Sequence, residues 1–179
     1  MKLSTQEEYG LRCLLQIARL EFSHGESVTI SAISQAEGLS VANVGKFVRA
    51  LRLGGFVDSE RGHAGGYRLA RPAAEISVRD ILDALGGKLF DAEFCEEHSG
   101  AISACTHSVE CSVRSLWNSV QFLVDRLLNQ VSLQDMLGGE QALASRLSDR
   151  SEALLQVGSV EGPQVGALAP VSDGSDPER

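Results

Sequence analysis

The chain has 179 residues, which is long enough to fold around a hydrophobic core of its own. Its contents of 43% hydrophobic and 22% charged residues are typical of globular proteins. An aromatic content of 5% favours a helical protein packed by leucine, valine and alanine, and a net charge of −8 argues against nucleic-acid binding by the chain as a whole. Neither a signal peptide nor a run of roughly 18 apolar residues is present, so we expect a cytoplasmic protein with no membrane partner. In that compartment clustered cysteines bind metal or do redox chemistry more often than they form stable disulfides.

The first predicted element is a helix over residues 5–20. Its opening run, Thr5-Gln6-Glu7-Glu8, has the pattern of a capping box. Apolar side chains then recur at helical spacing, at Tyr9, Cys13, Ile17 and Leu20. We expect Cys13 to be a small buried hydrophobe on that face.

Two further helices are expected next. Thr29 is in position to cap a helix that ends at Gly38, and Ser40 to cap a helix that ends at Gly54 and Gly55. The predicted core face of the later helix consists of Val41, Val44, Phe47, Val48 and Leu51.

The hydrophobic period then changes. FVDSE and YRLA flank the turn RGHAGG, which predicts a two-stranded hairpin, and Ser77 follows as the cap of a short helix, VRDILDAL. Helix, tight turn, helix and then a basic hairpin is the element order of a winged helix-turn-helix. In that arrangement the helix from Ser40 enters the major groove of DNA.

Positive charge is concentrated in this part of the chain. Between residues 46 and 71 there are six basic and two acidic residues, whereas from residue 91 onward there are fourteen acidic and five basic ones. A basic patch within an acidic protein is an electrostatic footprint for DNA, although a solvated helix face would show the same pattern.

The candidate DNA-binding residues lie on the helix from Ser40 and at the hairpin tip. Off the core face of that helix are Ser40, Ala42, Asn43, Lys46 and Arg49. Asparagine can read adenine, lysine can bind guanine or phosphate, and serine can bind phosphate. Gly45 either allows close approach to DNA or to another helix, or is simply tolerated at about 1 kcal/mol relative to alanine. Arg61 and His63 form the predicted wing, with Arg61 available to the minor groove.

Three of the four cysteines, Cys95, Cys105 and Cys111, lie within seventeen residues. Gaps of nine and five residues do not match the paired ligands of structural zinc sites, whereas a loop can wrap an iron–sulfur cluster at looser spacing. Three thiolates leave one position of a four-ligand cluster to fill, for which His98 and His107 are nearby candidates. A redox-active thiol loop without metal would use the same cysteines.

A long helix is expected after Cys111, with Ser112 in the capping position. Its apolar residues form one stripe, at Val113, Leu116, Val120, Leu123 and Leu127. Over roughly five turns such a stripe is longer than a small domain covers, so we expect a second copy of the chain to cover it. VSLQDML should return onto the body, residues 139–156 should form a weakly amphipathic helix, and the Gly-, Pro- and acid-rich stretch after it should be disordered.

Together these segments resemble a known family. MKLSTQEEYGLR, the motif R-G-x-x-G-G-Y-x-L followed by I-x-V-x-D-I-L, and three cysteines before a long helix are similar to the IscR/NsrR/RirA/CymR family of bacterial winged-helix transcription regulators. The resemblance covers about residues 1–138. It implies a homodimer that binds a palindromic operator in double-stranded DNA. It also implies that a 4Fe-4S or 2Fe-2S cluster sets DNA affinity in response to redox state, nitric oxide or iron supply.

The resemblance implies a ligand set as well. The three clustered cysteines would hold the cluster, although their first gap of nine residues exceeds the five to seven more usual in the family. The IscR branch has a histidine three residues after its third cysteine, where this chain has Arg114. The NsrR branch takes a carboxylate from near the N-terminus of the partner subunit, and Glu8 matches that position. Glu8 is also the last residue of the predicted capping box.

The predicted fold is therefore mainly α with a small β-hairpin wing, a winged helix-turn-helix domain plus a long dimerisation helix. We divide the chain into a DNA-binding domain (1–86), a cysteine-rich cluster loop (87–111), a dimerisation helix with its return segment (112–138) and a largely disordered extension (139–179). No catalytic set is visible, so we do not expect an enzyme. The alternatives are a cluster-free regulator controlled by thiol oxidation or a protein partner, as in the CymR branch, and an iron–sulfur or zinc redox protein.

Overall fold

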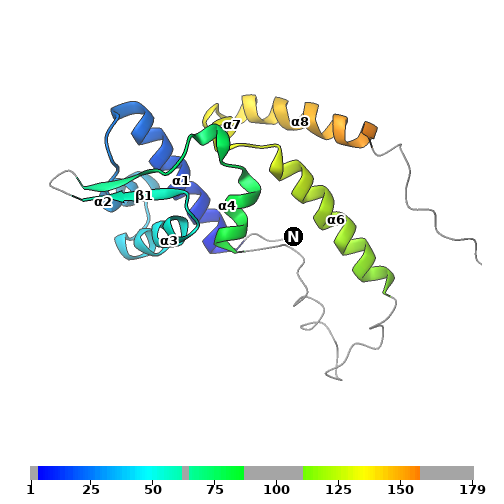
Figure 1. Cartoon of the computed structure of the whole chain (residues 1–179), viewed down its shortest axis with the longest axis horizontal. Helices are drawn as coiled ribbons and strands as arrows, with labels where there is room; N and C mark the ends of the chain where they lie inside the picture. Colours follow the sequence, from blue (N-terminus) through cyan, green and yellow to red (C-terminus); the bar gives the residue numbers. More distant parts are fainter. Residues whose placement is uncertain (1–3, 62–64, 87–110, 158–179) are drawn as a thin grey trace, which may run out of the picture.

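The computed structural model describes residues 4–61, 65–86 and 111–157, with side chains up to residue 152. The described part is mainly helical with one two-stranded antiparallel hairpin, as predicted (Figure 1). The N-terminal lobe contains α1 (Thr5–His24), α2 (Ile30–Glu37), α3 (Val41–Leu53), β1 (Val57–Glu60), β2 (Gly66–Leu69), the 3-10 turn η1 (Ala73–Glu75) and α4 (Val78–Leu85). It is followed by α6 (Ser112–Asn129), α7 (Leu133–Leu137) and α8 (Glu140–Val157). None of the helices in these ranges is long and apolar enough to cross a membrane.

Most helices of the lobe begin where the sequence predicts. The side-chain oxygens of Thr29, Ser40 and Ser77 each accept the backbone N–H three residues ahead, at 3.1, 3.3 and 3.1 Å. Each bond satisfies one of the N–H groups that a helix leaves unpaired in its first turn, and so starts the helix at that residue.

The start of α1 differs from the prediction by one residue. Ser4, rather than Thr5, is the N-cap: its hydroxyl accepts the N–H of Glu7 at 3.2 Å, and the Glu7 carboxylate accepts the N–H of Ser4 at 2.7 Å. Glu7 is buried against the end of α4, where a Cβ on Gly86 would lie 2.7 Å from its side chain. The predicted capping role of Glu8 is therefore wrong, and its side chain is exposed.

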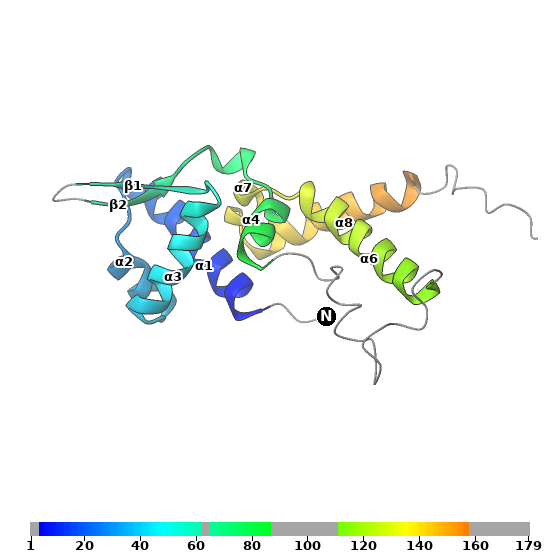
Figure 2. The same cartoon turned by 60° about the horizontal axis from the view of Figure 1, so that its bottom comes forward.

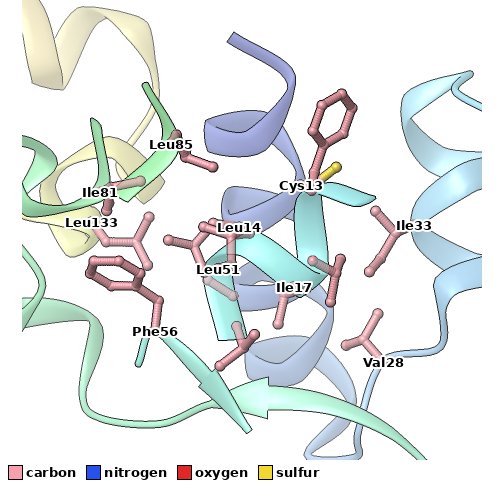
Figure 3. Packing of buried hydrophobic residues seen from close by; sticks show 14 of the residues in the cluster. Cys13, Leu14, Ile17, Val28, Ile33, Leu51, Phe56, Ile81, Leu85 and Leu133 are labelled. Carbon is pink, nitrogen blue, oxygen red and sulfur yellow. The ribbon is translucent and has the colours of Figure 1, made fainter. Parts of the chain in front are cut away.

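The core lies between α1, α2, α3, α4 and α7, with β1 along one side (Figure 3). Leu14, Ile17, Leu51 and Ile81 are completely buried in it. Cys13 is also completely buried, and this burial raises the pKa of its thiol to about 11. The thiol is therefore neutral at physiological pH, which confirms the predicted role as a small hydrophobe.

The hairpin is fastened to the lobe beside α2. Val28, in the connection between α1 and α2, exchanges two backbone hydrogen bonds of 2.8 Å with Tyr67 of β2. The contact requires glycine at position 66, because a Cβ there would lie 2.8 Å from the backbone of Val28. This explains the second glycine of the G-G-Y motif.

The segment after α6 returns onto the lobe, as predicted. The N–H of Val78 donates to Val131 and the N–H of Leu133 donates to Ile76, both at 2.8 Å. Leu133 is completely buried in the core. We call this pair of backbone bonds the 76–133 bridge.

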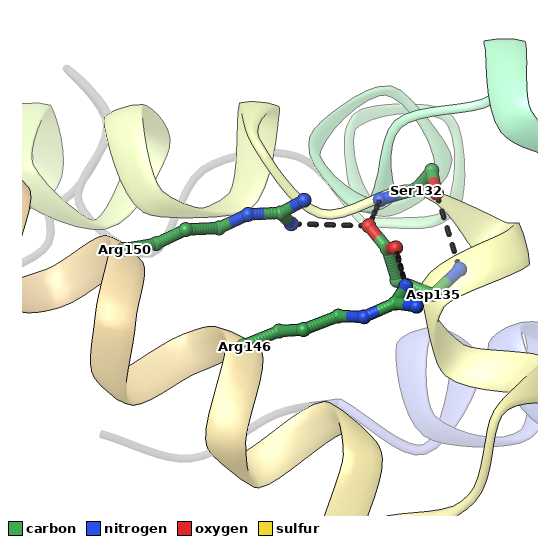
Figure 4. A network of polar contacts seen from close by, with 4 residues as sticks. All are labelled: Ser132, Asp135, Arg146 and Arg150. Carbon is green, nitrogen blue, oxygen red and sulfur yellow. Dashed lines mark hydrogen bonds and ion pairs between the residues drawn. The ribbon is translucent and has the colours of Figure 1, made fainter.

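Helix α8 is joined to α7 through one buried carboxylate (Figure 4). Asp135 accepts hydrogen bonds from the guanidinium groups of Arg146 and Arg150 on α8 and from the backbone N–H of Ser132. The helix predicted at 139–156 is thus present and anchored. The predicted disordered tail lies outside the described residues.

We expect Asp135→Asn to release α8. Burial opposes the charge on Asp135, but hydrogen bonds from Ser132 and Arg150 outweigh it and lower the pKa to about 2. A carboxylate with a folded pKa below its unfolded value of about 3.9 stabilises fully above about pH 4, and this contribution is lost as the pH falls toward 2. At pH 7 the variant should lose about 1–3 kcal/mol of unfolding free energy, and the amides of α8 should exchange faster with deuterium.

The matched control is Asp149→Asn, which removes an exposed carboxylate from α8 itself. It should leave exchange in α8 unchanged. If the amides of α8 exchange in Asp135→Asn at the wild-type rate, the ion pairs of Asp135 do not hold the helix.

Candidate DNA-binding face and cluster ligands

Helix α3 has one buried and one exposed face. Val44, Phe47, Val48 and Leu51 are buried, as predicted, and hold the helix on the lobe. The predicted DNA-binding residues of this helix are all exposed: Ser40, Ala42, Asn43, Lys46 and Arg49. Positions 42, 46 and 49 follow one another at helical spacing, so the structure brings these side chains together on one face.

The first turn of α3 presents polar and apolar groups side by side. The hydroxyl of Ser40 accepts the N–H of Asn43, which leaves the hydroxyl proton to donate to a phosphate. Val41 was predicted to lie in the core, and this is wrong because its side chain is 56% exposed. The helical period continues one turn beyond the edge of the core, and periodicity alone does not show where the core ends.

Among the residues that the structure describes, none packs so closely on Gly45 that a glycine is required there. A Cβ at this position would find its nearest described neighbour, Ile30 Cδ1, at 3.9 Å, which is an ordinary contact. We therefore expect Gly45→Ala to raise the unfolding free energy by about 0.5–1 kcal/mol in a denaturant titration. Gly66→Ala is the contrasting variant and should destabilise, because its Cβ would meet the backbone of Val28. A Gly45→Ala protein that is less stable than wild type would contradict this reading of the helix.

Not every basic residue counted in the sequence contributes a free positive charge to the surface of the lobe. Of the basic residues between 46 and 71, five are exposed and take part in none of the ion pairs within the described residues: Lys46, Arg49, Arg52, Arg61 and Arg71. Arg68 is different, since its guanidinium lies 3.2 Å from carboxylates of both Glu21 and Glu60. Its charge is compensated inside the lobe, so Arg68 fastens β2 to α1 and adds little to the basic patch.

The predicted wing projects from the lobe at the end opposite α6 (Figure 2). Arg61 directly follows β1 and is exposed. His63 lies outside the described residues. The wing and the exposed face of α3 thus belong to the same end of the molecule, because the packing of β1 against α3 and the Val28–Tyr67 contact hold the hairpin beside the helices.

Of the three predicted cysteine ligands, the structure describes Cys111. It is the N-cap of α6, and its Sγ accepts the backbone N–H of Arg114 at 3.3 Å. The predicted cap, Ser112, is instead the first helical residue. The partly exposed sulfur therefore lies at the positive end of a long helix, which stabilises negative charge. Cys95 and Cys105 lie outside the described residues.

Glu8, the predicted carboxylate ligand, is exposed in the first turns of α1. This end of α1 is tied to α4, because the side-chain amide of Gln6 donates to the carbonyl of Leu85 at 2.5 Å. Residue 87, where the cysteine-rich segment starts, follows two positions later. Within the described ranges, which leave out two of the cysteines and both His98 and His107, no three His, Cys, Asp or Glu side chains are grouped to hold a metal ion.

Comparison with known proteins identifies the family. Residues 3–139 match the model of the Rrf2 family, described as an iron-dependent transcriptional regulator. The chain belongs to the Rrf2 family. This Rrf2 protein is 36% identical over 139 residues to protein rrf2 of Nitratidesulfovibrio vulgaris, across 76% of this chain and 87% of that protein.

Solved structures of the family share its fold. CymR, the global cysteine regulator of B. subtilis, is similar with a TM-score of 0.62 and 28% identity, over 77% of this chain and 97% of CymR. IscR of T. potens is similar with a TM-score of 0.59 and 28% identity, over 86% and 90% of the two chains. The winged helix-turn-helix prediction is confirmed. The protein is a DNA-binding transcription regulator and not an enzyme.

Proposed function

We propose that this Rrf2 regulator acts in the cytoplasm as a homodimer on a palindromic operator, and that an iron–sulfur cluster sets its affinity for DNA. The observation that carries the proposal is the position of Cys111 as N-cap of α6, a helix on which three residues of the apolar stripe are exposed within the described part of the chain. The proposed cluster ligand and the dimer helix are then adjacent in the chain, so gain or loss of the cluster acts directly on the helix that joins the two subunits.

The exposed residues of this stripe support the dimer. Val113, Leu116 and Leu123 are 60%, 55% and 53% exposed, and the one buried residue of α6 is Gln121. Helix α6 extends away from the lobe (Figure 1). Apolar side chains repeated along an isolated helix face indicate a helical partner, and a second copy of α6 supplies a matching stripe.

The proposed ligands are Cys95, Cys105 and Cys111 of one subunit and Glu8 of the partner subunit. The thiolates are soft ligands that suit iron–sulfur clusters, whereas a carboxylate is a hard ligand and would form the weakest of the four ligand bonds. In a bound cluster, the iron held by the carboxylate would be the one that nitric oxide, oxygen or iron scarcity removes most easily. Glu8 is free of the capping box, and its helix is fastened to α4, so gaining or losing this ligand acts on the DNA-binding lobe.

The deciding experiment is anaerobic purification of the full chain, with iron and sulfide counted and DNA binding measured before and after cluster removal. We expect brown protein whose affinity for its operator differs between the two states. Colourless protein with no bound iron or sulfide would contradict the cluster.

A cluster-free thiol switch is the second candidate, and the partly exposed Cys111 thiol at a helix N-terminus favours it. It predicts colourless protein whose DNA affinity changes when peroxide modifies Cys111, as followed by mass spectrometry. The two candidates therefore differ in the first measurement.

We expect Arg61→Ala to weaken operator binding by about 1–3 kcal/mol if the wing arginine makes specific contacts. The slope of log affinity against log salt should become shallower by about 1, because one fewer phosphate is neutralised. The control is Arg19→Ala, which removes an exposed arginine of α1 outside residues 40–71. Equal salt slopes and affinities for wild type and Arg61→Ala would remove Arg61 from the interface.

A further inference from the structure

Arg79 is a buried cation at the joint between the DNA-binding lobe and the long helix. Its side chain is 9% exposed and lies on α4, on the face that packs against α6. Few arginines are buried to this extent without a specific set of partners, because removing a charge from water is costly.

The partners of Arg79 come from both helices. Its Nη1 lies 2.5 Å from Asp83 Oδ1 on α4, and its Nε lies 2.7 Å from Asp125 Oδ1 on α6. The amide of Gln121, the buried residue of α6, donates to the same Asp125 oxygen at 2.5 Å. A planar guanidinium held by two carboxylates fixes direction as well as distance, which apolar contacts do not.

This ion pair holds α6 on the lobe at a second point. The first is the 76–133 bridge, just beyond the C-terminal end of α6. Asp125 lies about 6 Å along the helix from its last residue, Asn129, at 1.5 Å per residue. With one point fixed the helix can pivot; with two, its direction relative to the lobe is set.

The length of α6 amplifies any change at this joint. Its 18 residues span about 27 Å, and Cys111 lies at the far end. A pivot of about 10° at the bridge would displace that end by roughly 5 Å. In a dimer joined through α6, the same pivot changes the separation of the two α3 helices.

We propose that Arg79 is a positioning residue that sets the angle between lobe and dimer helix, and thereby the spacing between operator half-sites that the dimer accepts. The inference rests on the proposed homodimer. A buried ion pair adds little net stability compared with apolar packing, so its value here is the geometry that it specifies.

The test uses full-length protein, purified anaerobically, and an operator selected by the wild type from random duplex DNA. Affinity is measured for that operator, for versions with the half-sites moved closer or further apart by one and two base pairs, and for a single half-site. Wild type should prefer its own spacing over the two-base-pair shifts by about tenfold or more. Arg79→Met, which keeps the apolar stem, should reduce this preference to about threefold or less, with single half-site affinity unchanged.

Two further variants make the result specific. Asp125→Asn leaves Arg79 paired with Asp83 and should relax the spacing preference in the same direction, and it decides the question if Arg79→Met does not fold. Arg12→Met is the control, because it breaks an ion pair of 2.8 Å with Glu37 inside the lobe and should keep the wild-type preference.

A wild-type spacing preference in folded Arg79→Met or Asp125→Asn would overturn the positioning role and leave the proposed dimer intact. A wild-type protein that binds single half-sites and paired half-sites equally, at every spacing, would overturn the proposed dimeric function and this inference with it.

Discussion

Cys111→Ser protein, purified without oxygen, is expected to be colourless and to contain less than about a tenth of the wild-type iron and sulfide, because a serine hydroxyl is a poor replacement for a thiolate at a cluster iron. The substitution separates this loss from misfolding. Serine is among the best N-cap residues, and its Oγ can accept the Arg114 N–H that the Cys111 sulfur now accepts at 3.3 Å. Helix α6 should therefore form as in the wild type, which far-ultraviolet circular dichroism can check.

Cys13→Ser is the internal control for this experiment. Its side chain is completely buried in the core, so it should not reach the cluster, and a serine there can bond to the carbonyl one helical turn earlier. The colour should persist. If Cys111→Ser retains the wild-type iron and sulfide content, Cys111 is not a ligand.

Glu8→Ala tests the proposed fourth ligand of the cluster. Because Ser4 and Glu7 form the cap of α1, removing the Glu8 carboxylate leaves that cap in place, and the loss of its charge near the helix start costs only about 0.3–1 kcal/mol. We expect a cluster with altered visible spectrum and faster loss of iron. A wild-type spectrum and decay rate would exclude Glu8 and make His98 or His107 the better candidate.

Replacing Leu116 and Leu123 together by lysine is expected to halve the mass of the protein measured by light scattering. Both side chains are more than half exposed in the single chain, so the change should not disturb the fold of the subunit itself. Burial of a leucine contributes about 1.5–3 kcal/mol, and a symmetric dimer loses four leucines at once. The dimer would also have to bury four lysine charges that repel one another.

Phe22→Lys is the matched control, since it introduces lysine at an apolar residue of α1 that is 89% exposed. It should leave the mass at the wild-type value. A well-folded Leu116→Lys/Leu123→Lys protein with the wild-type dimer mass would place the interface on another surface.

Local signals predicted much of the fold. The caps Thr29, Ser40 and Ser77 stand where expected, because each bond joins residues three apart and depends on little else. Helix α6 spans Ser112–Asn129 as its apolar period indicated, since the stripe continues at helical spacing over that whole stretch. The hairpin was recognisable from the change of period around a glycine-rich turn.

Local signals were insufficient where two solutions compete. Ser4 and Thr5 each precede a glutamate by three residues, so both can open a capping box. The choice of Ser4 places Glu7 against the end of α4, a contact that exists only once the chain is folded. For the same reason Val41 follows the helical period but lies beyond the edge of the core.

The sequence by itself therefore determined the elements, the exposed face of α3 and the family, because these depend on spacing, capping and motif within short stretches. Tertiary structure alone decided which charges are compensated and how the parts are joined. Arg68 is held by Glu21, 47 residues away, and Arg79 is held by Asp125 of α6. Such pairs form where segments distant in the sequence meet in space, and local spacing along the chain does not show which of these segments fold against each other.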